Sequence, residues 1–397
     1  MQRSEFLKMC ALLGIGSPLL GSCGILKESG SAAGESLLQP DEKVVIIGAG
    51  AAGLTAAYLL KRKGVEVTVL EAAETYGGRI ESLKGFTDFT IPLGAEWLHT
   101  TEPVLADIVD NDAVKIDVQT TAYDFEVDYC LDAETGEKMN LKKMQLTKGD
   151  LRFTNSSWLD FYEQYILPGI AELIQYKQVV NNIDYTGELI NITTDREVFT
   201  AHRVIVTVPV TMLKNQSISF IPALPQKKRE AVEALDLYKG CKAFIAFKEP
   251  FYPTFIKVQD EGKGPTRAYF DAAYGKNSKD HILGLVAVGP YADVYLQRKE
   301  EERIQFILKE LDEWFEGQAT PNYIKHTFKN WSEDPFAQGT YYPEFSLKTV
   351  TAIRAMARPV DNRIFFAGDL YTDGKSGWSM VHVAAESAKK AVDTLMR

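Results

Sequence analysis

The clearest hydrophobic pattern of the chain begins with a short apolar run and continues as a helical repeat. Val44 to Ile47 are consecutive apolar residues, which is typical of a strand buried on both faces of a parallel sheet. Ala51 to Arg62 then places apolar side chains at helical spacing, namely Leu54, Ala57, Tyr58 and Leu60. A second apolar strand follows from Val67 to Leu70. The pattern therefore predicts a strand, a helix packed against it and a second strand.

Three later stretches also carry a pattern. Glu302 to Phe315 repeats apolar residues along one helical face, and the charged run from Arg298 to Arg303 is expected to be its solvated start. Ile166 to Val180 suggests a further helix, and Glu188 to Val206 suggests strands. Residues 100–160 show only weak periodicity.

The turn between the first strand and the helix is rich in glycine, and its spacing matches G-x-G-x-x-G. Gly48 allows the tight turn, Gly50 lets the backbone approach a pyrophosphate, and Gly53 lets the helix pack closely on the strand. The pyrophosphate would lie at the helix N-terminus, around Ala52, where unpaired N–H groups favour an anion. Glu71, at the end of the second strand, is placed to accept a hydrogen bond from a ribose hydroxyl. The sequence therefore predicts a dinucleotide site, and these residues alone leave NAD and FAD open.

Composition and charge fit a large soluble enzyme. With 397 residues and 45% hydrophobic content, the chain can bury a substantial core and is long enough for two or three domains. The formal net charge of -10 argues against a nucleic-acid-binding surface and is compatible with cationic substrates. Cys130 and Cys241, the cysteines outside the N-terminal segment, form neither a disulfide framework nor a metal-binding spacing. We therefore expect no metal site.

Six segments of the chain resemble consecutive motifs of the flavin-containing amine oxidases. They occur in the family's order and span nearly the whole chain after residue 40: Ala72–Ile80, Leu93–His99, Val204–Pro209, Lys242–Tyr252, Trp331–Tyr341 and Arg363–Asp369. The ordered set is more specific than any one motif. The resemblance implies that the nucleotide is FAD. Thr340, at the place of the cysteine that bonds to the flavin in monoamine oxidases, implies that FAD is bound noncovalently.

The resemblance also implies the fold and the domain organisation. We expect an α/β fold with an FAD-binding Rossmann-type domain of the glutathione-reductase-like kind, and a second sheet-and-helix substrate domain over the flavin. The resemblance assigns residues 41–99, 168–212 and 358–397 to the FAD-binding domain. It assigns residues 100–167 and 213–357 to the substrate domain.

These motifs also imply a set of cofactor-binding residues. Besides the glycine loop and Glu71, they are Gly78, Arg79, Gly94, Ala95, Glu96, Trp97, Val180, Trp331, Gly368, Asp369, Met380 and Val381. Val180 matches a position that contacts the adenine half through its backbone, and an ordinary strand valine is an equal alternative. Asp369 replaces the family's more usual glutamate, and we expect it to keep that role. A helix expected from near Ser379 to Met396 would point its N-terminal N–H groups at the flavin.

Amine oxidation requires the substrate to react as the neutral amine, because the nitrogen lone pair must stabilise the developing iminium. A water-excluding pocket lowers the pKa of an ammonium, and aromatic walls flank the nitrogen without offering a carboxylate. Tyr341 matches one such wall in the family, Trp378 is the candidate for the opposite wall, and Met380 is the alternative. Lys242 matches the lysine that reaches flavin N5 through a water, so we expect it to be catalytic. His99 matches a residue beside the substrate amine in polyamine oxidases.

The resemblance implies an FAD-dependent oxidation of a polyamine-like or other primary or secondary amine. Hydride transfer to flavin N5 gives an imine and then an aldehyde, and dioxygen as acceptor gives hydrogen peroxide. The open alternatives are an L-amino-acid oxidase, a carbon–carbon desaturase and a non-catalytic FAD-binding lipoprotein. An amino-acid oxidase needs an arginine for the substrate carboxylate, and Arg152 and Arg267 are the candidates. A desaturase does not need Lys242.

The N-terminal segment resembles an export signal. Basic residues precede an apolar run from Met9 to Leu20 that is too short to span a bilayer. Leu20 to Cys23 resembles the lipobox of bacterial lipoproteins, in which the cysteine is lipidated, and an ordinary signal peptide is the alternative. Residues 24–40, rich in Gly, Ser, Ala and Glu, predict a flexible linker. We therefore expect residues 1–23 to be a signal peptide and the protein to be exported, either periplasmic or anchored to the membrane at Cys23.

Overall fold

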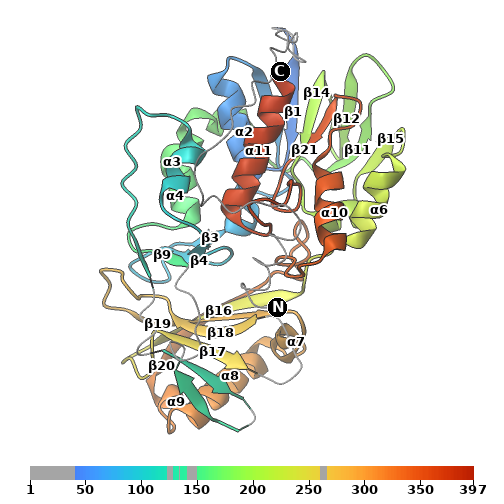
Figure 1. Ribbon diagram of the computed structural model, residues 1–397. Coiled ribbons are helices and arrows are strands. Elements are labelled where there is room, and N and C mark those ends of the chain that lie inside the picture. Colours follow the sequence, from blue (N-terminus) through green and yellow to red (C-terminus); the bar gives the residue numbers. More distant parts are fainter. Residues whose placement is uncertain (1–40, 123–127, 134, 141–149, 260–265) are drawn as a thin grey trace, which may run out of the picture.

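The structure of the protein, a computed structural model, describes residues 41–122, 128–133, 135–140, 150–259 and 266–397 (Figure 1). The predicted signal peptide, the lipidation site at Cys23 and the predicted linker lie outside the described residues. Within these residues, no helix has the length and apolar character needed to span a bilayer. In the view of Figure 1, an upper part is built on a parallel sheet and a lower part on a larger mixed sheet.

The sheet of the upper part has five parallel strands. In sheet order they are β10 (Ile174–Gln175), β2 (Glu66–Leu70), β1 (Lys43–Ile47), β14 (Arg203–Val206) and β21 (Ile364–Phe366). The strand predicted at residues 44–47 is the central strand β1, and all its apolar side chains are buried. Because both faces of the sheet are covered, the central strand β1 and its neighbours β14 and β21 are continuous apolar runs over most of their length.

Two helices, α2 (Ala51–Arg62) and α11 (Val381–Leu395), cover one face of the parallel sheet and pack against each other. The bounds of α2 are those that the apolar spacing predicts. Its residues Leu54, Ala57 and Leu60 are fully buried in this core. The strand–helix–strand prediction is therefore confirmed.

The same core extends into two helices of the segment that follows. Leu105 of α3 (Pro103–Val109) and Phe161 of α4 (Trp158–Tyr165) are buried together with residues of α2 and α11. Part of the segment 100–167, which the sequence assigns to the substrate domain, therefore shares a core with the parallel sheet.

The opposite face of the parallel sheet packs against a four-stranded sheet and three helices. In sheet order the strands are β13 (Val198–Ala201), β12 (Ile190–Thr194), β11 (Val180–Asp184) and β15 (Ser219–Ile221), and the helices are α5 (Val210–Lys214), α6 (Gln226–Ala234) and α10 (Leu347–Ala357). Strand β15 pairs in parallel with β11, and α6 packs on α10. The domain divisions predicted at residues 213 and 358 therefore cut through elements that share one core.

The lower part is a seven-stranded sheet with helices on its outer face. In sheet order the strands are β20 (Tyr323–Asn330), β16 (Gly240–Phe247), β19 (His281–Val288), β18 (Thr266–Asp271), β17 (Phe255–Gln259), β7 (Tyr129–Asp132) and β8 (Lys138–Asn140). The helices are α7 (Pro290–Leu296), α8 (Glu300–Trp314) and α9 (Ala319–Asn322). Helix α8 confirms the helix predicted at residues 302–315.

Strand β16 separates two hydrophobic cores by the alternation of its side chains. Cys241, Ala243 and Ile245 pack toward the helices of the lower part. Phe244 and Ala246 belong to a different cluster on the other face of the sheet, toward the upper part. Because side chains alternate along a strand, Lys242 shares this second face.

Short elements connect the two large sheets. They are β3 (Ser82–Leu83) paired with β4 (Ile91–Pro92), a three-stranded sheet of β5 (Trp97–Leu98), β9 (Leu151–Phe153) and β6 (Thr120–Ala122), and the 3-10 helix η1 (Gly78–Ile80). These short elements thus lie along the boundary between the upper and lower parts.

The helix predicted at residues 166–180 is not formed, and this prediction is wrong. Two 3-10 turns, η2 (Leu167–Gly169) and η3 (Ala171–Leu173), follow α4 and lead into β10. Pro168 disfavours helical backbone at the residue before it, and Gly169 has a low helix propensity. The strands predicted within residues 188–206 are present as β12, β13 and β14.

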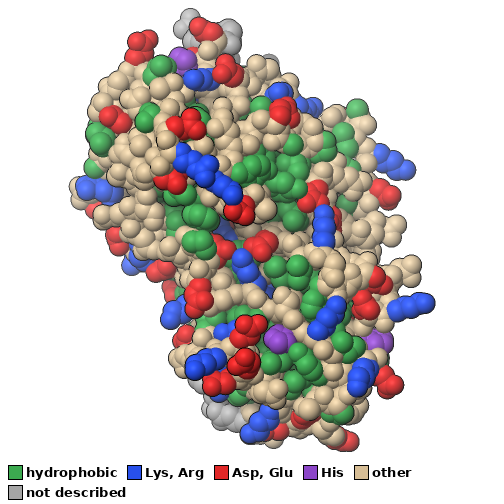
Figure 2. Space-filling model, turned by 180° about the vertical axis from the view of Figure 1, so that it is seen from behind, with side chains coloured by type: hydrophobic (Ala, Val, Ile, Leu, Met, Phe, Trp, Pro, Cys, Tyr) green, Lys and Arg blue, Asp and Glu red, His purple; other side chains and the backbone are tan. Residues whose placement is uncertain are grey.

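Charged side chains of both signs are interspersed over the face seen from behind (Figure 2). Hydrophobic side chains lie between them, over both the upper and the lower part. On this face, charge is therefore mixed and not separated by sign.

Candidate active site

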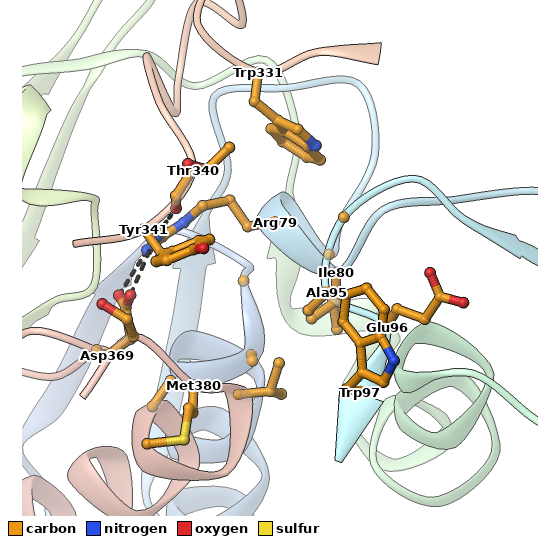
Figure 3. A pocket seen from close by; sticks show the side chains of 18 of the residues that line it. Arg79, Ile80, Ala95, Glu96, Trp97, Trp331, Thr340, Tyr341, Asp369 and Met380 are labelled. Carbon is orange, nitrogen blue, oxygen red and sulfur yellow. Dashed lines mark hydrogen bonds and ion pairs between the residues drawn. The ribbon is translucent and has the colours of Figure 1, made fainter. Parts of the chain in front are cut away.

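Two adjoining cavities lie at the carboxyl ends of the parallel strands, and both have Gly50, Arg79, Thr207 and Trp331 in their walls. The larger, which we call the loop cavity, has a volume of about 690 Å³ and is lined by the segments that follow β1, β2 and β14. The smaller, which we call the inner cavity, has a volume of about 200 Å³ and reaches β16, β19 and the start of α11 (Figure 3). Ligands of open parallel sheets bind at this place, beyond the carboxyl ends of the strands.

The three glycines of the predicted loop have different surroundings. Gly48 has φ +103°, which favours glycine, and a Cβ atom there would lie 2.8 Å from the hydroxyl oxygen of Thr207. A Cβ atom at Gly53 would lie 1.9 Å from the carbonyl oxygen of Gly48, so helix and strand pack as closely as predicted. A Cβ atom at Gly50 would have only the carbonyl oxygen of Gly77 within 4 Å, at 3.8 Å. The backbone at Gly50 is therefore open to a ligand.

The N-terminus of α2 reaches the cavities with its N–H groups uncapped. Among the described residues, no side chain caps this end, and the first turn holds no acidic residue. Ala51 and Ala52 line the inner cavity. The free N–H groups and the helix dipole together provide a binding position for an anion.

Glu71 follows β2 and lines the loop cavity, as does Val180 at the start of β11. The Oε2 atom of Glu71 accepts a hydrogen bond from the N–H of Ala49 (2.6 Å), and Oε1 accepts one from the N–H of Ala73 (2.8 Å). Burial raises the pKa of Glu71, and the backbone N–H groups act in the opposite direction. The N–H of Ala72 also acts on the carboxylate, which still keeps acceptor capacity for a further donor. Binding of a ribose hydroxyl by Glu71 stays a prediction.

Arg79 links the loop after β2 to the segment after β21. Its Nη2 donates to Oδ1 of Asp369 (2.6 Å), and its Nη1 donates to Oδ2 of Asp369 (3.1 Å) and to the carbonyl oxygen of Thr340 (2.8 Å). Figure 3 shows this pair in the wall of the inner cavity, with Tyr341 beside it. Gly78, with φ +54°, precedes Arg79 and lines the loop cavity. The predicted cofactor residues of these distant segments are therefore brought together.

Close backbone packing positions another group of predicted cofactor residues. The N–H of Ala95 donates to the carbonyl oxygen of Arg79 (2.9 Å), and a Cβ atom at Gly94 would lie 2.0 Å from the same oxygen. Trp331 is buried, and its indole N–H donates to the carbonyl oxygen of Leu93 (2.9 Å). Gly94, Ala95 and Trp331 all line the inner cavity, together with Glu96 and Trp97.

Gly368 and the start of α11 close the inner cavity on the side of the parallel sheet. Gly368 has φ +158°, and a Cβ atom there would lie 2.8 Å from the ring of Tyr371. The helix predicted to begin near Ser379 begins at Val381, with Met380 as its N-cap and no side-chain cap among the described residues. Met380 and Val381 both line the cavity.

Lys242, the predicted catalytic residue, lines the inner cavity from β16. Its ammonium donates hydrogen bonds to Oε2 of Glu96 (2.7 Å) and to the carbonyl oxygens of Pro92 and Gly94 (both 3.0 Å). Burial lowers the pKa of Lys242, whereas the carboxylate of Glu96 acts to raise it. Glu96 also accepts a hydrogen bond from Arg152 (2.7 Å). Lys242 therefore lines the cavity with its ammonium bonded to protein groups, and its contact with flavin N5 through a water stays a prediction.

The structure separates the two candidates for the second wall. Tyr341 and Met380 line the inner cavity, and Figure 3 shows Met380 at the start of α11 with Trp97 across from it. Trp378 lines neither cavity. It is buried among the residues between the parallel sheet and α10, with its ring centroid 4.4 Å from that of Phe345. The structure therefore places Met380, and not Trp378, at the cavity, because Trp378 packs into the core behind it.

Of the other residues predicted to bind substrate, one lines the inner cavity and two line neither cavity. His99 lines the inner cavity, and its Nδ1 lies 2.9 Å from Oδ1 of Asp150, with a side chain that is 38% exposed. Arg152 and Arg267 line neither cavity, because Arg152 is bonded to Glu96 and Arg267 to Glu310.

Sequence reasoning did not identify Thr207, which lines both cavities and donates its hydroxyl to the carbonyl oxygen of Ile47 (2.8 Å). Its place in the motif from Val204 to Pro209 was the available signal. Cys130 and Cys241 are buried and free, and no group of three or more potential metal ligands occurs in the described part of the chain.

Comparisons with known proteins agree with this geometry. Residues 169–396 match the model of the family "Flavin containing amine oxidoreductase", and residues 46–111 match that of the "NAD(P)-binding Rossmann-like domain". The fold is similar to that of a putrescine oxidase mutant, with a TM-score of 0.72 at 15% identity over 89% of this chain and 98% of that one. The predicted α/β fold with a Rossmann-type domain is thus confirmed.

Curated relatives include two kinds of protein. Polyamine oxidase 4 of Oryza sativa subsp. japonica is 23% identical over 88% of each chain. Lysine-specific histone demethylase 2 of Homo sapiens is 25% identical over 83% of this chain and 50% of its own length. The chain therefore spans about half the length of the demethylases that it matches. Since the family model covers more than half of the chain, the protein belongs to the flavin-containing amine oxidoreductases, whose cofactor is FAD.

Proposed function

We propose that the protein oxidises an amine, either polyamine-like or another primary or secondary amine, to an imine that hydrolyses to an aldehyde. Dioxygen is the proposed acceptor and hydrogen peroxide the second product. The observation that carries the proposal is the state of the charged groups around the inner cavity. The charged side chains and the histidine that line it are each paired with another group of the protein, namely Arg79 with Asp369, Lys242 with Glu96, and His99 with Asp150.

FAD fits the two cavities on three grounds. The backbone at Gly50 is open, the N-terminus of α2 is uncapped among the described residues, and Glu71 retains acceptor capacity in the loop cavity. Gly48, Gly50, Gly78, Glu71 and Val180 would hold the nucleotide. When bound, FAD supplies a ring that takes up a hydride equivalent from the carbon beside the amine nitrogen.

The pairing of the cavity charges favours a neutral amine. Asp369 is held by Arg79, and Glu96 by Lys242, so neither carboxylate is free to keep a substrate nitrogen in the ammonium form. Tyr341 and Met380 offer walls without charge and restrict water around the reacting nitrogen. A cation in such surroundings loses its proton more readily than in water. The substrate is therefore bound in the form that can transfer a hydride.

His99 and Asp150 support a substrate with a second nitrogen. His99 reaches the inner cavity while its side chain stays partly exposed, and Asp150 is 55% exposed. A distal ammonium near this pair would remain solvated, so it would be recognised without the cost of burying a charge. This position favours a polyamine over a simple monoamine.

The paired arginines disfavour the amino-acid oxidase alternative. Such an enzyme needs a guanidinium that forks onto the substrate carboxylate. Of the arginines in the described part of the chain, Arg79 is the one that lines the inner cavity, and its fork is already bonded to Asp369.

Anaerobic reduction of the flavin tests the proposal. The purified protein is mixed without oxygen with polyamines, monoamines and L-amino acids in turn, and the flavin absorbance is followed. We expect polyamines to bleach the flavin fastest. Faster bleaching by L-amino acids would favour amino-acid oxidation. Failure of every amine would leave a non-catalytic FAD protein, and full turnover of the Lys242→Met variant would favour a desaturase.

We further propose that the protein is exported and anchored through a lipid at Cys23. This proposal rests on the N-terminal sequence. Expression of the full chain in a bacterium with a labelled fatty acid tests this. We expect label in the wild type and none in Cys23→Ala, with the variant released from the membrane fraction. An unlabelled wild type would leave the ordinary signal peptide as the explanation.

A further inference from the structure

A buried carboxylate lies between two cationic side chains beside the inner cavity. Oε1 of Glu96 accepts a hydrogen bond from Arg152, and Oε2 accepts one from Lys242, both at 2.7 Å. Their side chains are 4%, 2% and 5% exposed, respectively. Buried charges cost stability unless they are well paired. Loss of either hydrogen bond of Glu96 would therefore leave a buried charge without its partner. Glu96 and Lys242 both line the inner cavity, so the arrangement is in reach of the cofactor site.

The surroundings of Lys242 define its protonation state. Its Nζ has three acceptors, namely Oε2 of Glu96 and the carbonyl oxygens of Pro92 and Gly94, at 2.7, 3.0 and 3.0 Å. An ammonium has three N–H donors, whereas a neutral amine has two and would leave one acceptor unmatched. The geometry therefore fits a protonated lysine. In this arrangement each of its donors is taken by the protein.

The remaining groups around Lys242 cannot replace Glu96. Trp97, Phe244 and Phe270 lie over the ammonium, with centroids 5.4, 5.2 and 5.5 Å away. Aromatic faces attract a cation weakly compared with a buried carboxylate. Arg152 carries the same charge as Lys242 and acts to lower the pKa of Lys242.

Other charged side chains of the neighbouring elements surround Glu96, Arg152 and Lys242. Lys276 donates to the carbonyl oxygen of Phe153 (2.9 Å), and burial lowers the pKa of Lys276 to about 8. Asp160 acts on Lys276, and Asp271 interacts with Arg152. Glu96 is therefore the carboxylate that directly opposes the cations packed around it.

We propose that Glu96 is a positioning residue that fixes Lys242 as a cation in the wall of the inner cavity, so that Lys242 acts through its charge and not by passing a proton to a water. This deepens the proposed function and rests on the FAD site. A fixed positive charge stabilises the negative charge that an electron-accepting ring gains on reduction. Without Glu96, burial and the charge of Arg152 would both act to lower the pKa of the Lys242 ammonium further.

The midpoint potential of the bound FAD tests the proposal without any amine. At neutral pH, we expect Lys242→Met to shift the potential of the wild type in the negative direction. In the Glu96→Gln background we expect the same change to alter the potential little at neutral pH, because Lys242 has already lost its proton there. Lowering the pH should make the effect of Lys242→Met reappear in the Glu96→Gln background, as Lys242 regains its proton.

Glu310→Gln is the matched control, because Glu310 is paired with a buried arginine, Arg267, and lines neither cavity. It should lower the melting temperature of the protein and leave the potential unchanged. If Lys242→Met shifts the potential by the same amount with and without Glu96, so that the shifts are additive in the double variant, Glu96 has a structural role only and the proposal is wrong.

A second measurement tests the proposal without Glu96→Gln, in case that variant does not fold. The difference in potential between wild type and Lys242→Met is followed from about pH 6 to about pH 8. A constant difference supports a lysine held as a cation, and a difference that disappears within this range overturns it. If no amine reduces the flavin but these shifts are present, the proposed function fails and this inference stands.

Discussion

Arg79 and Asp369 form a two-point ion pair, at 2.6 and 3.1 Å, across 290 positions of the sequence. The pair joins the loop after β2 to the segment after β21. Both residues line the inner cavity, so the pair holds together a wall built from the two ends of the chain. Asp369→Ala leaves the Arg79 guanidinium without its carboxylate, and hydrogen bonds to charged groups contribute about 1.5–3 kcal/mol. We expect FAD to bind ~10- to 100-fold more weakly, as each 1.4 kcal/mol is tenfold.

Titration of the FAD-free protein with FAD measures this change. Asp373→Ala is the control, because Asp373 pairs with Lys390 at the surface, four residues along the chain, and lines neither cavity. Equal FAD affinities for the two variants would show that the Arg79–Asp369 pair does not organise the site.

Gly53→Ala tests the close approach between α2 and the glycine loop. The new Cβ atom would lie 1.9 Å from the carbonyl oxygen of Gly48, which is backbone and cannot rotate away. Overpacking of this kind costs about 1–3 kcal/mol or more, which exceeds the gain of ~1 kcal/mol in helix propensity. We expect a lower midpoint in urea unfolding and a colourless protein. Gly169→Ala, where the nearest atom is a ring carbon of Tyr58 at 3.9 Å, should change stability by less than ~0.5 kcal/mol.

His382 should make stability depend on pH in the acidic range. It lies in the first turn of α11, is 8% exposed, and its Nδ1 has no hydrogen-bond partner among the described residues. Burial, with the nearby His99, lowers the pKa of His382 from 6.5 to about 4. Between these values the unfolded chain binds a proton that the folded chain does not, so the free energy of unfolding falls as the pH falls.

The total loss is on the order of 3 kcal/mol, at 1.36 kcal/mol per pKa unit. Unfolding in urea at several pH values measures it, with His382→Leu as the comparison. The wild type should lose stability relative to the variant as the pH falls through this window, and be unaffected above it. Parallel stability curves for the two proteins would contradict the assignment.

Local patterns predicted the nucleotide half of the site well. The bounds of α2 and the roles of Gly48 and Gly53 depend on neighbours within a few residues or on a single turn, and the structure reproduces them. The helix predicted at residues 166–180 fails because its apolar residues face the core from two 3-10 turns and a strand. An apolar spacing alone does not distinguish these cases, and Pro168 was the informative residue.

Long-range pairing explains what the sequence could not reveal. The parallel pairing of β15 with β11 places residues 219–221 with the upper part, and no local signal marks it. Glu96 was predicted to bind cofactor, but its bonds to Arg152 and Lys242 join residues 56 and 146 positions away. Such a charge arrangement is visible only after the sheets have been assembled.

Mutation can decide whether Met380 or Trp378 forms the second wall of the amine pocket. Met380 is the N-cap of α11 and lines the inner cavity beside Val381, whereas Trp378 is buried in the core behind the cavity and packs on Phe345 at its edge. Met380→Ala widens the pocket at the reacting nitrogen, and loss of precise positioning costs up to about 100-fold in rate. We expect a lower rate of anaerobic flavin reduction by the best amine, with little change in melting temperature.

Trp378→Phe is the opposite case, because it keeps an aromatic ring in the core and removes an indole N–H that has no partner among the described residues. It should change the melting temperature by no more than about 2 °C, as ~1 kcal/mol does in a chain of this size, and leave the rate of flavin reduction unchanged. A large loss of rate in Trp378→Phe, together with a wild-type rate in Met380→Ala, would return the second wall to Trp378. That result would mean that the segment from residue 376 to 380 rearranges when FAD and substrate bind.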